Sequence, residues 1–156
     1  ESFSKMLENR IDILTPKQLL FSEPIVERLG VKHDLLCTSR EYEEVSKLSK
    51  IRHFDLVFVG KHGGGDKKTK LEASIERISK LSKKIEKFKP DLVISFGSPE
   101  AARISFGLGI KHIMFCDSPH ANAVMRLTLP LIQKLLIPYV IPVSYTHLTL
   151  PTIYSV

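Results

Sequence analysis

The chain has no tryptophan and only two cysteines among its 156 residues. Cys37 and Cys116 each fall within an apolar run, and no C-x-x-C spacing occurs, which excludes a zinc ribbon or a thioredoxin-like site. We expect two buried, reduced thiols, and neither a metal ion nor another cofactor. No stretch approaches the roughly 18 consecutive apolar residues that cross a bilayer, and residues 1–6 lack the apolar core of a secretory signal. The sequence therefore predicts a cytoplasmic protein without a transmembrane segment.

Two sequence motifs of well-known enzyme classes are also missing. Segments 14–18 and 96–100 do not contain the G-x-G-x-x-G pattern, which excludes ordinary dinucleotide binding. The loop His62-Gly63-Gly64-Gly65 is similar to an α/β-hydrolase oxyanion loop, but no serine is flanked by the glycines of G-x-S-x-G. We therefore reject a hydrolase.

Nearly all of the formal net charge of +6 comes from one segment. Residues 66–89 contain nine Lys or Arg against four Asp or Glu. The same segment predicts an amphipathic helix, because apolar residues recur every three or four positions. No aromatic residues interleave with the charges to stack on bases, so we favour a solvated helix face over nucleic-acid binding. The apolar positions are Leu71, Ile75, Ile78, Leu81, Ile85 and Phe88.

Apolar runs rich in β-branched residues alternate with helix-patterned segments along the chain, which is typical of βαβ units. The pattern predicts a single Rossmann-like domain over residues 1–142, a three-layer α/β/α fold with a mostly parallel sheet of about six strands. The expected strands are 11–14, 34–38, 54–59, 91–96, 112–116 and 135–141.

Three of these strands are followed by a hydroxyl residue and a proline: Thr15-Pro16, Ser98-Pro99 and Ser118-Pro119. A hydroxyl side chain at the N-cap accepts a backbone hydrogen bond, and proline suits the first helical position. The pattern predicts three helix starts at the carboxyl edge of the sheet, where open α/β sheets bind ligands.

Titratable groups gather at the same predicted edge. Asp117 and His120 form a candidate acid–base pair, whereas a purely structural reading leaves Asp117 or Ser118 as a cap and His120 in solvent. Glu100 lies in the first turn of a predicted helix, where the dipole also favours a carboxylate. Gly97 and Ser98 precede it as candidate ligand contacts.

Two further candidates lie nearby in the sequence. Gly63 and Gly64, beside His62, could let a phosphate approach the backbone, although a flexible loop needs no such role. Lys17 could neutralise a phosphate, although isolated cations are usually surface residues.

The end of the chain departs from the pattern. After Lys134 no charged residue appears, and residues 143–156 have no helical periodicity. We expect the native domain to end near Pro142 and residues 143–156 to form a non-native or disordered tail.

Four segments together resemble a largely archaeal family of uncharacterised proteins related to glycosyltransferase-B enzymes and UDP-N-acetylglucosamine 2-epimerases. The resemblance covers about residues 10–142. It implies the amino-terminal half of a two-domain fold, with a carboxyl-terminal nucleotide-binding domain absent from this chain. The segments are 12–17 (DILTPK), 59–64 (VGKHGG), 94–103 (ISFGSPEAAR) and 117–121 (DSPHA).

The resemblance implies that the site residues fall on His62, Ser98, Glu100, Asp117 and His120. Gln18 stands where the family commonly has histidine, so an acid–base role is in doubt there and a hydrogen-bonding role remains.

Three functions follow as alternatives. The first is the acceptor side of a nucleotide-sugar-dependent glycosyltransferase, the second is a nucleotide-sugar 2-epimerase-like enzyme, and the third is a non-enzymatic ligand-binding domain. In each case the expected ligand is a small nucleotide-sugar or sugar acceptor, and the isolated chain is expected to be inactive without its second domain.

Overall fold

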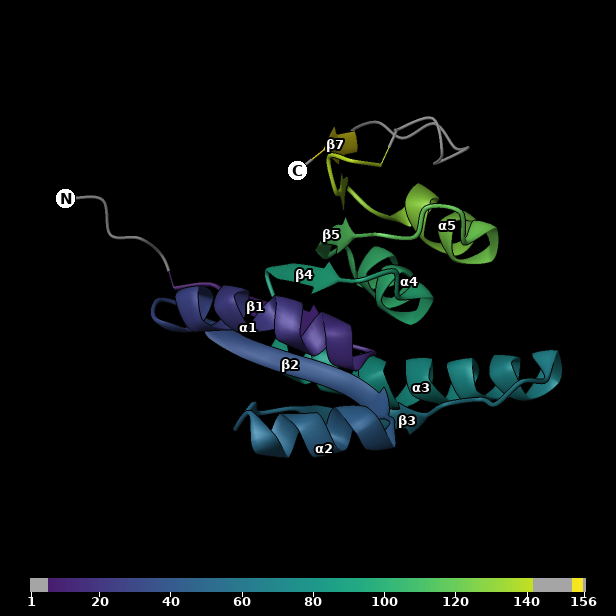
Figure 1. Ribbon diagram of the computed structural model, residues 1–156, viewed down its shortest axis with the longest axis horizontal. Helices are drawn as coiled ribbons and strands as arrows, with labels where there is room; N and C mark the ends of the chain where they lie inside the picture. The colour runs from purple at the N-terminus through teal and green to yellow at the C-terminus, as the bar shows by residue number, and fades with distance from the viewer. Residues whose placement is uncertain (1–5, 142–152, 156) are drawn as a thin grey trace.

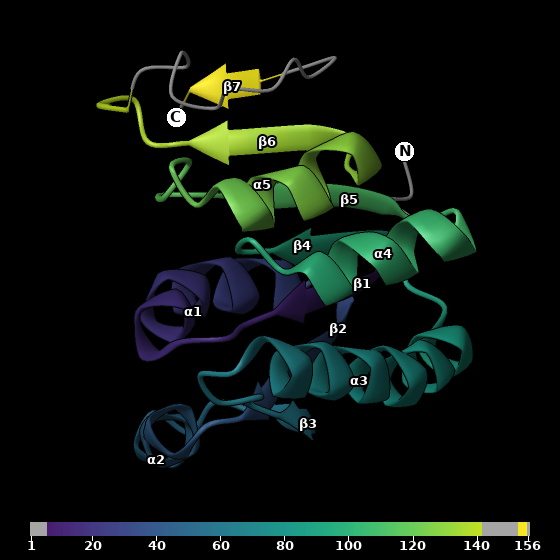
Figure 2. The same cartoon turned by 90° about the vertical axis from the view of Figure 1, so that its right-hand side faces the viewer.

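The computed structural model describes residues 6–141 and 153–155. Its centre is one parallel sheet with the strand order β3-β2-β1-β4-β5-β6-β7, which can be followed from bottom to top in Figure 2. The Rossmann-like α/β prediction is confirmed. The strands are β1 (Glu8–Asp12), β2 (Asp34–Glu41), β3 (Val57–Lys61), β4 (Leu92–Ser95), β5 (Lys111–Phe115), β6 (Lys134–Ile137) and β7 (Ile153–Ser155).

Helices cover both faces of the sheet. α3, α4 and α5 lie side by side across one face (Figure 2), and α1 and α2 pack together on the other. Side chains of β1 alternate between these faces, so Ile11 joins the apolar core beneath α1 and α2. The helices are α1 (Pro16–Gly30), α2 (Glu43–Ile51), α3 (Lys67–Phe88), α4 (Pro99–Leu108) and α5 (Asn122–Thr128), followed by the 3-10 turn η1 (Leu129–Leu131).

Two of the three predicted helix starts are confirmed. The Thr15 hydroxyl accepts a hydrogen bond from the Gln18 N–H at 3.3 Å, and the Ser98 hydroxyl accepts one from the Ala101 N–H at 3.2 Å. The third prediction is wrong, because α5 begins only at Asn122 and its N-cap makes no side-chain hydrogen bond. A turn replaces the expected first helical residues, and this leaves the Ser118 side chain free for other contacts.

The first strand lies earlier than predicted, over 8–12 instead of 11–14. The hydropathy pattern missed it because Asn9, Arg10 and Asp12 are polar and yet buried. Such burial requires hydrogen-bonding partners, which distant segments of the chain supply. Conversely, β6 ends at Ile137, well before the predicted end at residue 141.

The basic helix α3 is only half covered. Leu81 and Ile85 are buried as predicted, but Leu71 and Ile75 are 61% and 58% exposed. Figure 1 shows the reason, since the first turns of α3 extend beyond the sheet. The predicted apolar stripe therefore contacts the core only through the second half of the helix.

The predicted tail falls mostly outside the described residues. Residues 153–155 alone are placed, as a seventh strand that pairs with β6. The limit near Pro142 and the non-native character of 143–156 remain predictions. No helix in the described ranges is long and apolar enough to cross a membrane.

Candidate ligand site at the carboxyl edge

A cavity of about 490 Å³ opens where β4, β5 and β6 end and α1 begins. Its volume is within the range of small-molecule sites. Five of the predicted site residues line it, together with apolar side chains from four elements and loops. The predicted residues are Lys17, Gln18, Gly97, Asp117 and Ser118, and the others are Phe21, Phe96, Phe115, Cys116, Ala121, Val124, Leu136 and Pro138.

Three phenylalanines form one wall of this cavity. Phe96 and Phe115 are stacked, with ring centroids 5.3 Å apart and an interplanar angle of 18°. Phe21 of α1 lies edge-on to both, again at 5.3 Å. Offset-stacked and edge-to-face pairs are favourable arrangements of aromatic rings. The sequence did not single out these residues, because they come from segments that are far apart in the chain.

A charged pair lies at the rim. The ammonium group of Lys17 contacts the carboxylate of Asp117, and their side chains are 77% and 46% exposed. The hydrogen bond from Lys17 holds the pKa of Asp117 below its usual value. Asp117 also accepts a hydrogen bond from the Ser118 hydroxyl at 3.2 Å. Asp117 is therefore an ionised acceptor at the cavity mouth, and Lys17 is not the isolated cation that its sequence position suggested.

Gln18 connects two loops of the cavity wall. Its side-chain oxygen accepts a hydrogen bond from the Leu14 N–H at 2.8 Å, and its amide donates to the Phe96 carbonyl at 3.3 Å. The side chain thus holds the segment after β1 against the segment after β4. Both polar ends of the Gln18 side chain are thus bonded to backbone groups, and a hydrogen bond from Gln18 to a ligand stays a prediction.

Glu100 contacts α3, whereas the Lys17–Asp117 pair joins α1 to the loop after β5. The Glu100 carboxylate accepts a hydrogen bond from the Ser74 hydroxyl of α3 at 2.9 Å and lies 3.7 Å from the Arg77 guanidinium. The Ser98 hydroxyl is 3.5 Å from the same carboxylate. The predicted residues therefore divide into two groups, one facing α1 and the other facing α3.

The loop after β3 is shaped by its glycines. The Gly64 N–H donates to the His62 imidazole Nδ1 at 3.1 Å, and the Gly63 carbonyl accepts from the Thr69 hydroxyl at 2.6 Å. A Cβ atom at Gly63 would lie 2.6 Å from the Lys70 Cα, so only glycine fits there. Gly64 has a φ of +70°. His62 and His120 are both exposed, and neither lines the cavity.

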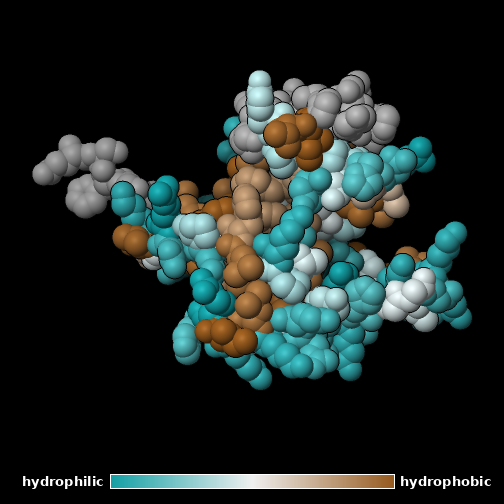
Figure 3. Space-filling model, in the orientation of Figure 1, coloured by the Kyte–Doolittle hydropathy of each residue, from teal (hydrophilic) through white to brown (hydrophobic). Residues whose placement is uncertain are grey.

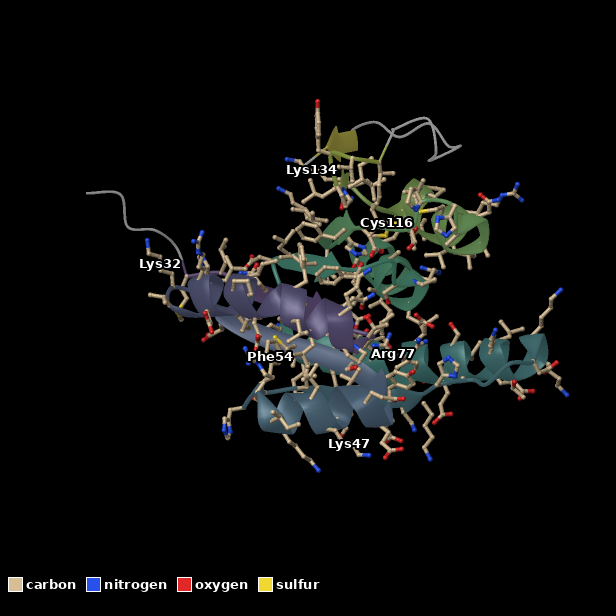
Figure 4. All side chains as sticks on the ribbon, viewed as in Figure 1. Lys32, Lys47, Phe54, Arg77, Cys116 and Lys134 are labelled. Atoms are coloured by element: carbon tan, nitrogen blue, oxygen red, sulfur yellow. The ribbon has the colours of Figure 1, made fainter. Side chains whose placement is uncertain are left out.

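A buried ionic network lies beneath the α3 side. Asp12 of β1 is within 2.7 Å of Arg77 and 2.9 Å of Arg10, and it accepts a hydrogen bond from the Thr38 hydroxyl at 2.8 Å. Burial alone would raise the pKa of Asp12, but the two guanidinium groups hold it far below its usual value. Figure 4 labels Arg77, whose side chain extends from α3 toward the sheet.

The sequence missed this network. Arg77 was counted with the solvated charges of α3, although its side chain is only 2% exposed. One signal was present, since Arg10 and Asp12 occupy alternate positions of a strand and must point to one face. Across residues 6–141, no group of three or more His, Cys, Asp or Glu side chains is arranged to hold a metal ion.

Two solved structures illustrate the fold that this chain shares with known proteins. A UDP-GlcNAc 2-epimerase from Neisseria meningitidis bound to UDP-GlcNAc aligns with a TM-score of 0.67 and 17% identity, over 85% of this chain and 40% of that protein. MurG from Acinetobacter baumannii aligns with a TM-score of 0.69 and 10% identity, over 95% of this chain and 45% of that protein. These likenesses show the fold, and the chain spans less than half of either protein.

Sequence comparison identifies a relative with higher identity. The uncharacterised protein MJ0665 of Methanocaldococcus jannaschii is 37% identical over 112 residues, which are 72% of this chain and 32% of that protein. Residues 7–148 match the family described as protein of unknown function, DUF354. This chain belongs to the DUF354 family, and its fold is that of the amino-terminal half of glycosyltransferase-B and UDP-GlcNAc 2-epimerase proteins.

Proposed function

We propose that this chain is the acceptor-binding half of a nucleotide-sugar-dependent glycosyltransferase. The main supporting observation is the Lys17–Asp117 pair at the rim of a cavity on the carboxyl edge of the sheet. An ionised carboxylate there can accept a hydrogen bond from a sugar or alcohol hydroxyl and orient its oxygen toward a second domain. That second domain, following in a longer chain, would bind the nucleotide.

The transfer step needs a base and a leaving group. His120 follows Asp117 in the same exposed turn and takes the proton of the acceptor hydroxyl as its oxygen bonds to the anomeric carbon of the donor. The bond from that carbon to the nucleotide diphosphate breaks, and the nucleotide leaves with the electron pair. Gly63 and Gly64, beside His62, would meet the donor phosphates, and Ser98 and Glu100 would contact sugar hydroxyls. No cofactor is required.

The test uses the protein with its second domain attached. Incubation with UDP-, GDP- and CMP-sugars and a cell extract as the source of acceptors should release nucleotide from at least one donor. Asp117→Asn and His120→Ala should each reduce the release rate at least tenfold, whereas Lys111→Ala, at the opposite end of β5, should not. Failure of every donor to release nucleotide would refute the proposal.

The same assay separates the competing functions. An epimerase would release no nucleotide to an acceptor but would incorporate solvent deuterium at the sugar ring during turnover. A non-enzymatic binding domain would bind a nucleotide-sugar without consuming it. Either result would replace the transferase proposal.

A further inference from the structure

The cavity has few polar groups, and most of these already have partners. Gln18 is held by two backbone groups, and Lys17 is paired with Asp117. Lys17 and Asp117 are the charged residues of the cavity lining and their charges cancel, so the lining offers no net positive charge to a phosphate group. A nucleotide diphosphate is consequently a poor occupant of this cavity.

The apolar part of the lining is extensive. Apolar surface is visible across the middle of the molecule in Figure 3. Phe21, at the cavity edge, is 51% exposed, so a ligand can cover more of its ring. Cys116, labelled in Figure 4, is a half-buried thiol that also lines the cavity. Val124 and Leu136 complete a lining that favours carbon-rich ligands over hydrated sugars.

We propose that the natural acceptor is a ring-containing alcohol, such as a phenol, whose ring packs against Phe21, Phe96 and Phe115 and whose hydroxyl reaches Asp117. Phe96 and Phe115 form a rigid stacked base, and Phe21 borders it edge-on. A planar ring adds a further edge-to-face or offset contact to this cluster. This inference rests on the proposed function, because it names the acceptor class for the same site.

The direct test measures binding to this chain without any nucleotide-sugar. Calorimetric titration should detect saturable binding of 2-naphthol and none of glucose or inorganic pyrophosphate. Phe21→Ala and Phe21→Leu should each weaken 2-naphthol binding by about tenfold. Leu20→Ala is the matched control, since Leu20 is the neighbouring residue of α1, is 49% exposed and does not line the cavity.

Two further measurements locate the ligand. Asp117→Asn should weaken 2-naphthol binding, because an amide is a weaker acceptor for the ligand hydroxyl than a carboxylate. Saturating 2-naphthol should slow alkylation of Cys116 by iodoacetamide in the wild-type chain. Thermal unfolding of each variant checks that the fold is retained.

The inference is overturned if glucose, pyrophosphate or the acyclic alcohol farnesol binds more tightly than 2-naphthol. It is also overturned if the Phe21 variants bind 2-naphthol as tightly as the Leu20→Ala control does. These outcomes are independent of the donor assay. Transfer of sugar to a carbohydrate acceptor without 2-naphthol binding would leave the proposed function intact and refute this inference. Binding of 2-naphthol without transfer from any donor would support this inference about the ligand and refute the proposed transferase function.

Discussion

Arg77 of α3 donates two hydrogen bonds to the carboxylate of Asp12 on β1, at 2.7 and 3.3 Å, across 65 positions of the sequence. Arg77 also donates to the Val59 carbonyl of β3 at 3.0 Å. One side chain thus joins a helix to two strands beneath the carboxyl edge. Gly60 allows this approach, since a Cβ atom there would lie 2.9 Å from the Arg77 Cβ.

Replacing Asp12 with asparagine should strongly destabilise the chain. The change would leave Arg10 and Arg77 buried with only the Glu100 carboxylate, 3.7 Å from Arg77, as a nearby opposite charge. Losing one partner of a buried ionic group costs about 3–5 kcal/mol. Urea unfolding should report this loss in the free energy of unfolding. Asp117→Asn is the control, because its exposed pair with Lys17 should contribute less than about 1 kcal/mol. Equal, small effects from both changes would contradict the buried network.

Stability should fall as the pH is lowered through the range set by His112. Burial, reinforced by the charge of Arg10, lowers the pKa of His112 from 6.5 to about 4. The folded state therefore keeps the imidazole neutral, while the unfolded chain takes up a proton below its ordinary pKa. The contribution of His112 to the free energy of unfolding is therefore fully present above pH 6.5. It decreases by roughly 3 kcal/mol as the pH falls toward 4.

His112→Asn tests this pH dependence. The variant should be less stable at neutral pH, because His112 is buried with its Nε2 2.7 Å from the Ser95 hydroxyl. Its free energy of unfolding should nevertheless change less between pH 6.5 and 4 than that of the wild type. An unchanged slope would assign the titration to another group. Asp12 affects stability over a more acidic pH range than His112, because its pKa is depressed in the folded state. Its stabilising effect is present above its ordinary pKa and is lost at more acidic pH.

Substitution by alanine should affect stability differently at two glycines of the loop after β3. Gly63→Ala places a Cβ 2.6 Å from the Lys70 Cα and 2.8 Å from the Thr69 carbonyl oxygen, so the start of α3 must shift. We expect a loss of about 1–3 kcal/mol, as for other overpacked sites. Gly65→Ala meets no atom within 4 Å and should change stability by less than about 0.5 kcal/mol. Thermal unfolding compares the two, and a neutral Gly63→Ala would show that the loop is not packed against α3.

Gln18→Leu should loosen the cavity wall. The substitution removes the acceptor of the Leu14 N–H and the donor to the Phe96 carbonyl, and leaving such groups unpaired costs about 1–3 kcal/mol. Gln18→Glu keeps the acceptor but loses the donor, so its stability should be intermediate at neutral pH. Hydrogen exchange of the Leu14 amide should accelerate in the leucine variant and change less in the glutamate variant. Equal exchange in all three proteins would contradict the proposed connection.

The caps at Thr15 and Ser98 illustrate what could be predicted from local patterns. Each depends on atoms within a few residues, so the hydroxyl and proline pair contained all the required information. The same pattern at Ser118 failed, since α5 begins only at Asn122 and the Ser118 hydroxyl donates to Asp117 instead of capping the helix. Asp117 in turn contacts Lys17 of α1, a partner 100 positions away that a local pattern does not describe.

The sequence by itself determined the alternation of strands and helices, the parallel sheet and the edge at which Asp117, Gly97 and Lys17 meet. These follow from hydrophobic periodicity and from the rule that successive parallel strands end on one side. Only the tertiary structure paired Glu100 with α3 and Asp117 with α1, buried Arg77 against Asp12 and assembled three phenylalanines into one wall. The physical reason is that these contacts join residues far apart in the chain, and their energies depend on distance and burial, which periodicity does not encode.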